Sequence, residues 1–204
     1  MFKKLVIVFE GIEGSGKSFH LNNLSYYLKK KKISHIKLRE PGGSINSEKI
    51  RKLILNNKSN FSSNTDLLLY LAARSENIVE LKKNYKKKVI IIDRFTDSTL
   101  AYQHFGMGIN KSIIKTLNRH ILENFKVDFT FLNTVNKSNM IKRLKSRKKL
   151  NRYDKFHIDF YDRVQKGYLK ISRMNKNKYQ IINSNIDIQK NKELIIKKVD
   201  QLLK

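Results

Sequence analysis

Short apolar runs alternate along the chain with longer stretches in which hydrophobic residues recur at helical spacing. The runs at 4–9, 89–92 and 129–132 are rich in β-branched, leucine and aromatic residues, which is typical of strands buried on both faces. Shorter runs at about 34–38 and 180–182 complete a set of five predicted strands. This alternation of strands and helices predicts an α/β fold, with a doubly wound parallel sheet flanked by helices and right-handed crossovers.

Apolar residues three or four positions apart predict helices that each bury one face. The first helix carries Leu21, Leu24 and Leu28, and a long one covers about 64–83. Asn110 precedes another apolar series and has the side chain of a helix N-cap. The remaining helices are marked by Ile50, Leu53 and Ile54, by Met140, Ile141 and Leu144, and by Leu194, Ile195 and Leu202. Ligands of such folds bind beyond the C-terminal ends of the strands, so the loops there should carry the chemistry.

The composition is that of a globular protein with one domain, which we expect to span 1–204. The 204 residues are 40% hydrophobic, enough for a core, and contain no cysteine, which excludes disulfides, thiolate metal sites and cysteine nucleophiles. No apolar run is long enough to cross a membrane, and the N-terminal stretch has Glu10 where a signal peptide would have its cleavage site. A cytoplasmic location without membrane association is therefore expected.

The formal net charge of +27 has two interpretations. It can indicate a nucleic-acid-binding protein. It can also reflect compositional drift, because the excess is mostly lysine in a chain rich in Asn and Ile, which share A/T-rich codons with lysine. The lysine runs at 29–32 and 86–88 fall where helices or turns should end, as expected for solvated faces. We therefore expect nucleic acid to bind non-specifically if at all, and the charge to attract anionic substrates.

A glycine-rich segment between the first strand and the first helix fits the pattern G-x-x-x-x-G-K-[ST] at every fixed position. In this motif backbone N–H groups surround a phosphate and the lysine, here Lys17, reaches the β- and γ-phosphates. The hydroxyl of Ser18 can ligate Mg²⁺. The predicted ATP-binding residues are Gly11, Ile12, Glu13, Gly14, Ser15, Gly16, Lys17 and Ser18. The segment therefore predicts binding of a nucleoside triphosphate.

Charged residues also follow two other predicted strands, at the edge where ligands bind. Arg39 and Arg94 each come directly after a strand, so their guanidinium groups can hold one phosphate between them. Asp93, just before Arg94, is placed to organise Mg²⁺ and its waters. A second Asp–Arg pair, at 162–163, lies inside a predicted helix and is interpreted as a surface pair. The sequence thus predicts a second anion beside the triphosphate.

Glu13, Tyr70 and Arg74 each have two interpretations. Glu13 puts a carboxylate in an anion-binding loop, where it either points to solvent or accepts a hydrogen bond from a hydroxyl of the second substrate. Tyr70 and Arg74 share one helical face. They are either a core tyrosine beside a surface arginine or a pair that stacks on a base and hydrogen-bonds its edge.

A basic segment at about 143–156 contains Arg147 and Arg152 where a predicted helix runs into a polar loop. One interpretation is a solvated basic stretch, which composition alone would favour. The other is a short lid whose arginines close over the transferring phosphoryl group. The sequence does not decide between the two.

Taken together, these segments resemble the thymidylate kinases, enzymes of the P-loop nucleoside monophosphate kinase type that phosphorylate dTMP with ATP. The resemblance covers nearly the whole chain and rests chiefly on Arg39–Gly43 (REPGG) and Ser98–Gln103 (STLAYQ), which are more specific than the glycine-rich loop. Glycine at position 14 resembles the bacterial variant, in which the lid supplies an arginine. The resemblance implies ATP and dTMP as substrates, Mg²⁺ as cofactor, in-line transfer that gives dTDP for dTTP synthesis, and a homodimer.

The resemblance also implies roles for single residues. Arg39 and Arg94 would hold the dTMP phosphate, Glu13 would address the 3′-hydroxyl, Tyr102 would crowd the sugar 2′ position and Tyr70 would stack on thymine. Arg74 and Gln103 would read the base edge. The predicted dTMP-binding set is Glu13, Arg39, Tyr70, Arg74, Arg94, Ser98, Tyr102 and Gln103. The predicted catalytic residues are Lys17, Asp93, Arg94, Arg147 and Arg152, and the predicted metal-binding residues are Ser18 and Asp93.

The chain departs from the family pattern at Phe19, His20 and Met107, where the family usually has a hydroxyl residue, Gln and Arg. Pro41 is a candidate cis-proline. Two alternatives stay open: a kinase for another nucleotide or a deoxynucleoside, and a basic nucleic-acid-binding ATPase. The paired arginines favour an acceptor that already carries phosphate, and no stripe of base-stacking aromatics supports the ATPase.

Overall fold

A parallel sheet of five strands forms the centre of the computed structural model, which describes residues 2–204. In spatial order the strands are β2 (His35–Arg39), β3 (Val89–Asp93), β1 (Val6–Glu10), β4 (Phe129–Thr134) and β5 (Tyr179–Asn183). Every pairing is parallel. The doubly wound fold and the five predicted strands are confirmed.

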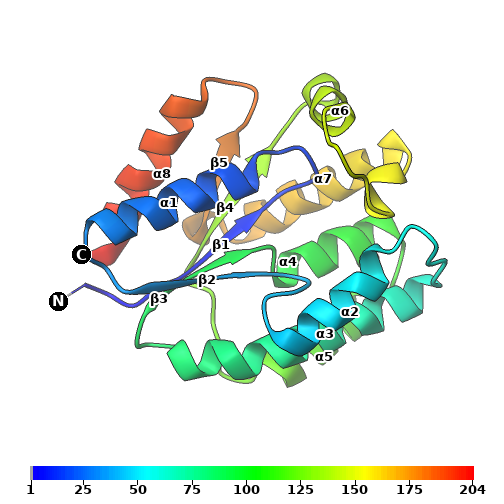
Figure 1. The fold of residues 1–204 in the computed structure, drawn as a ribbon, viewed down its shortest axis with the longest axis horizontal. Helices are drawn as coiled ribbons and strands as arrows, with labels where there is room; N and C mark the ends of the chain where they lie inside the picture. Colours follow the sequence, from blue (N-terminus) through cyan, green and yellow to red (C-terminus); the bar gives the residue numbers. More distant parts are fainter. Residues whose placement is uncertain (1) are drawn as a thin grey trace.

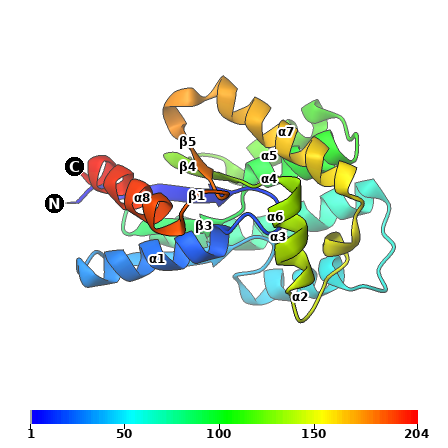
Figure 2. The ribbon, with the colours of Figure 1, turned by 90° about the horizontal axis from the view of Figure 1, so that it is seen from above.

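Helices cover both faces of the sheet (Figures 1 and 2). On one face lie α1 (Lys17–Lys30) and α8 (Ile188–Leu203); on the other lie α3 (Ser63–Asn84), α5 (Lys111–Leu122) and α7 (Ile158–Met174). The shorter helices are α2 (Ile45–Leu55), α4 (Thr96–Thr99) and α6 (Lys137–Lys145), with 3₁₀ turns η2 (Tyr153–Lys155) and η3 (Lys176–Lys178). Within residues 2–204, none of the helices has the length and apolar character needed to cross a membrane.

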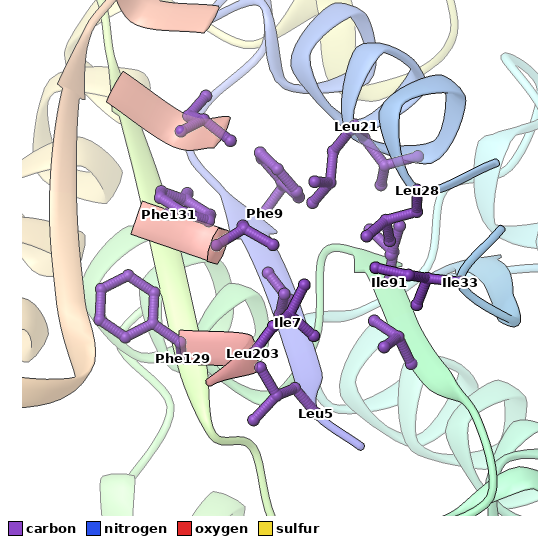
Figure 3. Close-up of a cluster of buried hydrophobic side chains, with 14 of the residues drawn as sticks. Leu5, Ile7, Phe9, Leu21, Leu28, Ile33, Ile91, Phe129, Phe131 and Leu203 are labelled. Atoms are coloured by element: carbon purple, nitrogen blue, oxygen red, sulfur yellow. The ribbon is translucent and has the colours of Figure 1, made fainter. Parts of the chain in front are cut away.

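Alternating side chains of the central strands form separate cores on the two faces of the sheet. Ile7 and Phe9 face α1 and α8, where they meet Leu21, Leu28 and Phe131 (Figure 3). Val6 and Val8, which point the other way, belong to a cluster with residues of α3. Burying each such side chain stabilises the fold by about 1.5–3 kcal/mol. The continuous apolar runs in the sequence are therefore the runs that are buried on both sides.

The structure of the chain after β3 was not predicted: it forms α4 and then continues as a π-helix, η1 (Leu100–Gly106), of seven residues. The wider turn of a π-helix has no periodic signature of its own, so spacing of apolar residues could not reveal it. It places Tyr102 and Gln103, both buried, at the C-terminal edge of the sheet. Such segments are frequent at functional sites.

Several local predictions are confirmed. The side chain of Asn110 caps α5 by accepting a hydrogen bond from the N–H of Ser112 at 2.8 Å. The Glu40–Pro41 peptide bond is cis. The Asp162 and Arg163 side chains are exposed on α7, as expected for a surface pair.

Candidate active site

The glycine-rich loop joins β1 to α1, as the motif requires. At Gly11, φ is +141° and an added Cβ would collide with the carbonyl oxygen of Asn133, so only glycine fits there. The ammonium group of Lys17 returns over the loop and donates to the carbonyl oxygens of Gly11 and Ile12, both at 2.9 Å. The loop and the N-terminus of α1 thus surround a space suited to an anion.

Lys17 is nearly buried, which changes its acid–base behaviour. Burial lowers the pKa of its ammonium group to about 8, and the positive charge of Arg94 adds to the shift. The nearby carboxylates of Asp93 and Glu13 act in the opposite direction without cancelling it. An incoming phosphate would favour the charged form of this lysine.

Ser18 and Asp93, the two predicted metal-binding residues, lie together although 75 positions separate them in the sequence. The Ser18 hydroxyl donates to Oδ2 of Asp93 at 2.8 Å. Both residues line the cavity beside the loop. A hydroxyl and a carboxylate are the oxygen ligands that Mg²⁺ prefers, so the residues present fit this ion.

This cavity, of about 220 Å³, opens at the C-terminal edge of the sheet. It collects residues from the glycine-rich loop, the ends of β2 and β3, α2, α3, η1 and the segment after α6. The predicted site residues that line it are Glu13, Lys17, Ser18, Arg39, Tyr70, Arg74, Asp93, Arg94, Ser98, Tyr102, Gln103 and Arg147. The fold therefore brings three residues of the predicted phosphate-binding loop and all of the predicted acceptor residues to one place.

Glu13 points into this cavity, which excludes the solvent-facing interpretation. Its Oε1 pairs with Nη2 of Arg94 at 2.7 Å, and its Oε2 accepts from the hydroxyl of Tyr102. Burial acts to raise the pKa of Glu13, but the charges of Arg94 and Lys17 outweigh it, so the pKa lies below the usual value. The Arg94 guanidinium also lies over the Tyr102 ring, 5.0 Å from its centroid. A carboxylate, a guanidinium and a phenol thus form one hydrogen-bonded group between the two predicted substrate sites.

Arg94 has a left-handed backbone, with φ of +66°. The chain that follows it is held by the carboxylate of Glu10, whose role the sequence analysis missed. The fully buried Glu10 accepts from the N–H groups of Phe95 and Ser98, at 2.8 and 3.2 Å, and from the Ser98 hydroxyl at 2.6 Å. Glu10 also accepts a hydrogen bond from the Tyr168 hydroxyl at 3.1 Å. The same hydroxyl accepts a hydrogen bond from Arg94 at 3.3 Å. These bonds fix the direction in which Arg94 enters the cavity.

Arg74 is buried, with 1% of its surface exposed, so the interpretation of it as a surface arginine is excluded. Its Nε and Nη2 donate to Oε2 of Glu40, at 2.8 and 2.7 Å, and its Nη1 donates to Thr99 and Asn118 at 2.9 and 2.6 Å. The buried amide nitrogen of Gln103 has no hydrogen-bond partner among the described residues. The inner end of the cavity therefore presents a fixed guanidinium and a free N–H donor.

Aromatic rings form another part of the cavity wall. Tyr70 and Tyr102 each meet the ring of Tyr153 edge-to-face, with centroids 5.9 and 6.0 Å apart. Burial raises the pKa of Tyr70 to about 12, so its phenol stays neutral. Tyr153 was missed because its sequence neighbourhood is a polar, lysine-rich loop. A flat base could stack in this part of the cavity.

Three arginines form a cluster of positive charge on the cavity wall. Arg39, more than half exposed, pairs with Glu48 at 3.0 Å. Arg51, which the sequence analysis missed in a basic helix, donates to the carbonyl of Pro41 at 2.6 Å and lines the cavity with Arg39 and Arg94. Burial, followed by the charge of Arg39, lowers the pKa of Arg51. These positive charges repel one another, and an anion that binds between them offsets this repulsion.

The predicted lid segment supplies one arginine to the cavity and keeps another outside it. Arg147 lines the cavity and pairs with Asp154. Arg152 does not line it: its guanidinium pairs with Asp66 at the start of α3. Arg143 lies against the glycine-rich loop and donates to the Gly14 carbonyl at 2.8 Å. The position of Arg152 thus differs from the expected place over the phosphoryl group, because Asp66 offers a buried counter-charge.

Comparisons with known proteins agree with this geometry. The family model described as thymidylate kinase matches residues 9–195. A thymidylate kinase of Thermosipho africanus is 39% identical over 85% of this chain and 87% of the relative, and one of Acholeplasma laidlawii is 34% identical over 98% and 99%. A crystal structure of thymidylate kinase from Ehrlichia chaffeensis superposes with a TM-score of 0.79 at 31% identity, covering 97% of this chain and 98% of that chain.

Proposed function

The chain belongs to the thymidylate kinase family, and from this premise we propose how its residues divide the work of the family reaction. The enzyme is a transferase of nucleotide biosynthesis that moves the γ-phosphoryl group of ATP to dTMP, giving dTDP and ADP. The observation that carries the assignment of roles is that one cavity is lined both by Lys17 of the phosphate-binding loop and by the pair Arg39 and Arg94.

The transfer is in-line and needs no covalent intermediate. An oxygen of the dTMP phosphate forms a bond to the γ-phosphorus of ATP while the bond from that phosphorus to the β,γ-bridging oxygen breaks, and ADP leaves with that oxygen. The protein contributes position and positive charge. Lys17 serves the β- and γ-phosphates, and Arg147 neutralises charge on the transferring group from the lid side.

Ser18 and Asp93 would hold the Mg²⁺ that accompanies ATP. The support is their hydrogen-bonded pair of oxygen ligands on the cavity wall. When bound, the ion supplies charge neutralisation on the β- and γ-phosphate oxygens. Ser18 would be a direct ligand, and Asp93 would order the ion's water molecules.

The acceptor phosphate and sugar have their own residues. Arg39 and Arg94 hold the dTMP phosphate, and the position of Arg51 in the same cluster supports a third contact. Glu13 accepts a hydrogen bond from the 3′-hydroxyl, and Tyr102 crowds the 2′ position, which favours deoxyribose. Glu13 and Arg94 neutralise each other, which compensates the cost of placing a carboxylate in an anion site.

Thymine recognition is assigned to Tyr70, Arg74 and Gln103, with Ser98 beside them. Tyr70 supplies a stacking surface. The unpaired amide N–H donor of Gln103 and the fixed guanidinium of Arg74 suit the carbonyl edge of thymine. The amino group of cytosine would leave the Gln103 donor unpaired, which is costly in a buried site.

We also propose that the enzyme is a cytoplasmic homodimer. Leu68 and Val79, eleven positions apart on one face of α3, are each 60% exposed. Leu53 of α2 and Ile113 of α5, on helices that pack against α3, are 52% and 51% exposed. Exposed apolar side chains on three helices that pack together suit contact with a second copy of the chain.

The proposal is tested by measuring ADP release from ATP with Mg²⁺ against dTMP, dUMP, dCMP, dGMP, AMP, UMP and thymidine. We expect a strong preference for dTMP and no turnover of thymidine, which lacks the phosphate that the arginines hold. Turnover of thymidine would contradict the arginine clamp. Equal rates with dCMP and dTMP would contradict the roles of Arg74 and Gln103.

A further inference from the structure

The segment between α6 and α7 is tied to the region around α2 and the start of α3 by one buried side chain. Arg152 has 14% of its side chain exposed, and its guanidinium pairs with Oδ1 of Asp66, which is 2% exposed. Its Nε donates to the carbonyl of Ile54 at 3.2 Å, and its backbone N–H donates to the carbonyl of Leu55 at 3.4 Å. Figure 2 shows this segment, in yellow, reaching α2. One residue thus makes contacts to three residues far away in the sequence.

The carboxylate of Asp66 accepts hydrogen bonds from two consecutive residues of this segment. While Oδ1 pairs with Arg152, Oδ2 accepts a hydrogen bond from the hydroxyl of Tyr153 at 2.8 Å. The rings of Tyr153 and Phe61 lie 5.1 and 5.5 Å from the Arg152 guanidinium, which shields the ion pair from water. Breaking a buried pair by removing one partner leaves an uncompensated charge. The contact is therefore a strong attachment and not a loose surface pair.

The attachment determines where two cavity residues lie. Arg147 and Tyr153 line the cavity and stand on either side of the attached point in the sequence, whereas Arg152 and Asp66 do not line it. A second contact, from the side-chain amide of Asn57 to the carbonyl of Leu150 at 2.9 Å, lies in the same place. If the attachment is lost, the arginine that serves the transferring phosphoryl group loses its fixed position.

We propose that Asp66 and Arg152 form a lid anchor, defined as this ion pair, and that it positions Arg147 and Tyr153 at the active site. Arg152 then acts through Asp66 and does not contact the transferring phosphoryl group. Asp66 becomes a positioning residue for phosphoryl transfer although it lies outside the cavity. The kinetic part of this proposal rests on the proposed function; the structural part does not.

The test compares Asp66→Asn, Arg152→Gln and the double variant. Each single substitution should lower kcat with dTMP by about tenfold or more, and the double variant should be no worse than the poorer single variant, because both remove one interaction. Asp162→Asn, which removes an exposed ion pair with Lys166 in α7, is the matched control and should keep the wild-type kcat. Circular dichroism establishes that each variant is folded.

A second readout needs no turnover. Lys148 and Lys149 are exposed in the segment that the anchor attaches, so trypsin should cleave there faster in Asp66→Asn and Arg152→Gln than in wild type or Asp162→Asn. Tyr153→Phe keeps the ring and removes only its hydrogen bond to Asp66, and it should give an intermediate cleavage rate. This conservative variant keeps the test valid if a charge substitution prevents folding.

Direct action of Arg152 on the phosphoryl group predicts a different pattern. Asp66→Asn would then leave kcat unchanged or raise it, and trypsin cleavage would not change in Asp66→Asn. That pattern would overturn the lid anchor. Absence of dTMP kinase activity in the wild-type protein would overturn the proposed function instead, and trypsin cleavage would still decide the anchor.

Discussion

Lys17 is the residue whose charge bears most directly on nucleotide binding. Its side chain must be protonated to attract the β- and γ-phosphates, and burial with the neighbouring Arg94 lowers its pKa to about 8. Below pH 8 the free enzyme carries this charge, and above pH 8 it progressively loses it. Binding of ATP then requires uptake of a proton, which weakens the apparent affinity as pH rises.

We therefore expect the Kd for ATP to be nearly constant from pH 6 to 7.5 and to increase above pH 8, by up to about tenfold per pH unit. Titration calorimetry in buffers of different ionisation enthalpy would measure both the affinity and the proton uptake. Constant affinity and no proton uptake up to pH 9.5 would show that Lys17 stays charged in the free enzyme.

The roles of some single residues could be predicted from the sequence, and those of others could not. The glycine-rich loop, Asp93 and Arg94 could be predicted because each lies at the C-terminal end of a strand or directly after it, so the local pattern fixes its place. Glu10 and Glu40 could not, because their roles come from hydrogen bonds to Ser98, Tyr168 and other residues 34 to 158 positions away. A carboxylate that holds an arginine or a backbone turn leaves no mark within its own segment.

At the scale of elements, the active site depends on close contact between α7 and η1. Gly167 of α7 leaves room for Phe105 of η1, and a Cβ at position 167 would lie 2.5 Å from that ring. The same element carries Tyr102 and Gln103 to the cavity. The strands and most of the helices were predictable from periodicity, but the π-helix and this contact were not, because both depend on packing between distant segments.

Gly167→Ala tests the importance of this contact. In an open helix the change would stabilise by about 0.5–1 kcal/mol, but here it pushes η1 away, at a cost of about 1–3 kcal/mol. Steady-state kinetics should show a larger increase in KM for dTMP than for ATP. Lys166→Ala, on the same helix and with an exposed ion pair, serves as the control and should change neither constant. Equal increases for both substrates would contradict the role of η1 in acceptor binding.

At the scale of the whole molecule, the surface has two distinct features, a large positive charge and a set of exposed apolar side chains. The net charge of +27 surrounds a site for two anionic substrates, so it raises their local concentration, and the effect should weaken with salt. The apolar residues on α2, α3 and α5 are a different feature, which the sequence could not reveal, because exposure follows only from how the helices pack.

The homodimer predicts that Leu68→Glu, at one of these exposed apolar positions, converts the protein to a monomer. A buried unpaired carboxylate at an interface is expensive, so the dimer should dissociate at micromolar concentrations. Sedimentation velocity measures the change. Leu194→Glu, on α8 and 45% exposed, is the matched control and should keep the wild-type mass. A wild-type monomer, or an unchanged dimer in Leu68→Glu, would exclude this surface as the interface.

The central claim is that Arg94 holds the acceptor phosphate beside the glycine-rich loop. It is tested most directly by comparing kcat/KM for dTMP in Arg94→Ala and Arg163→Ala, because both arginines follow an aspartate but only Arg94 lines the cavity. We predict a loss of about 10²-fold or more for Arg94→Ala, in line with removal of a buried charged hydrogen bond, and near wild-type values for Arg163→Ala. Equal losses in the two variants, or full activity in Arg94→Ala, would contradict the account.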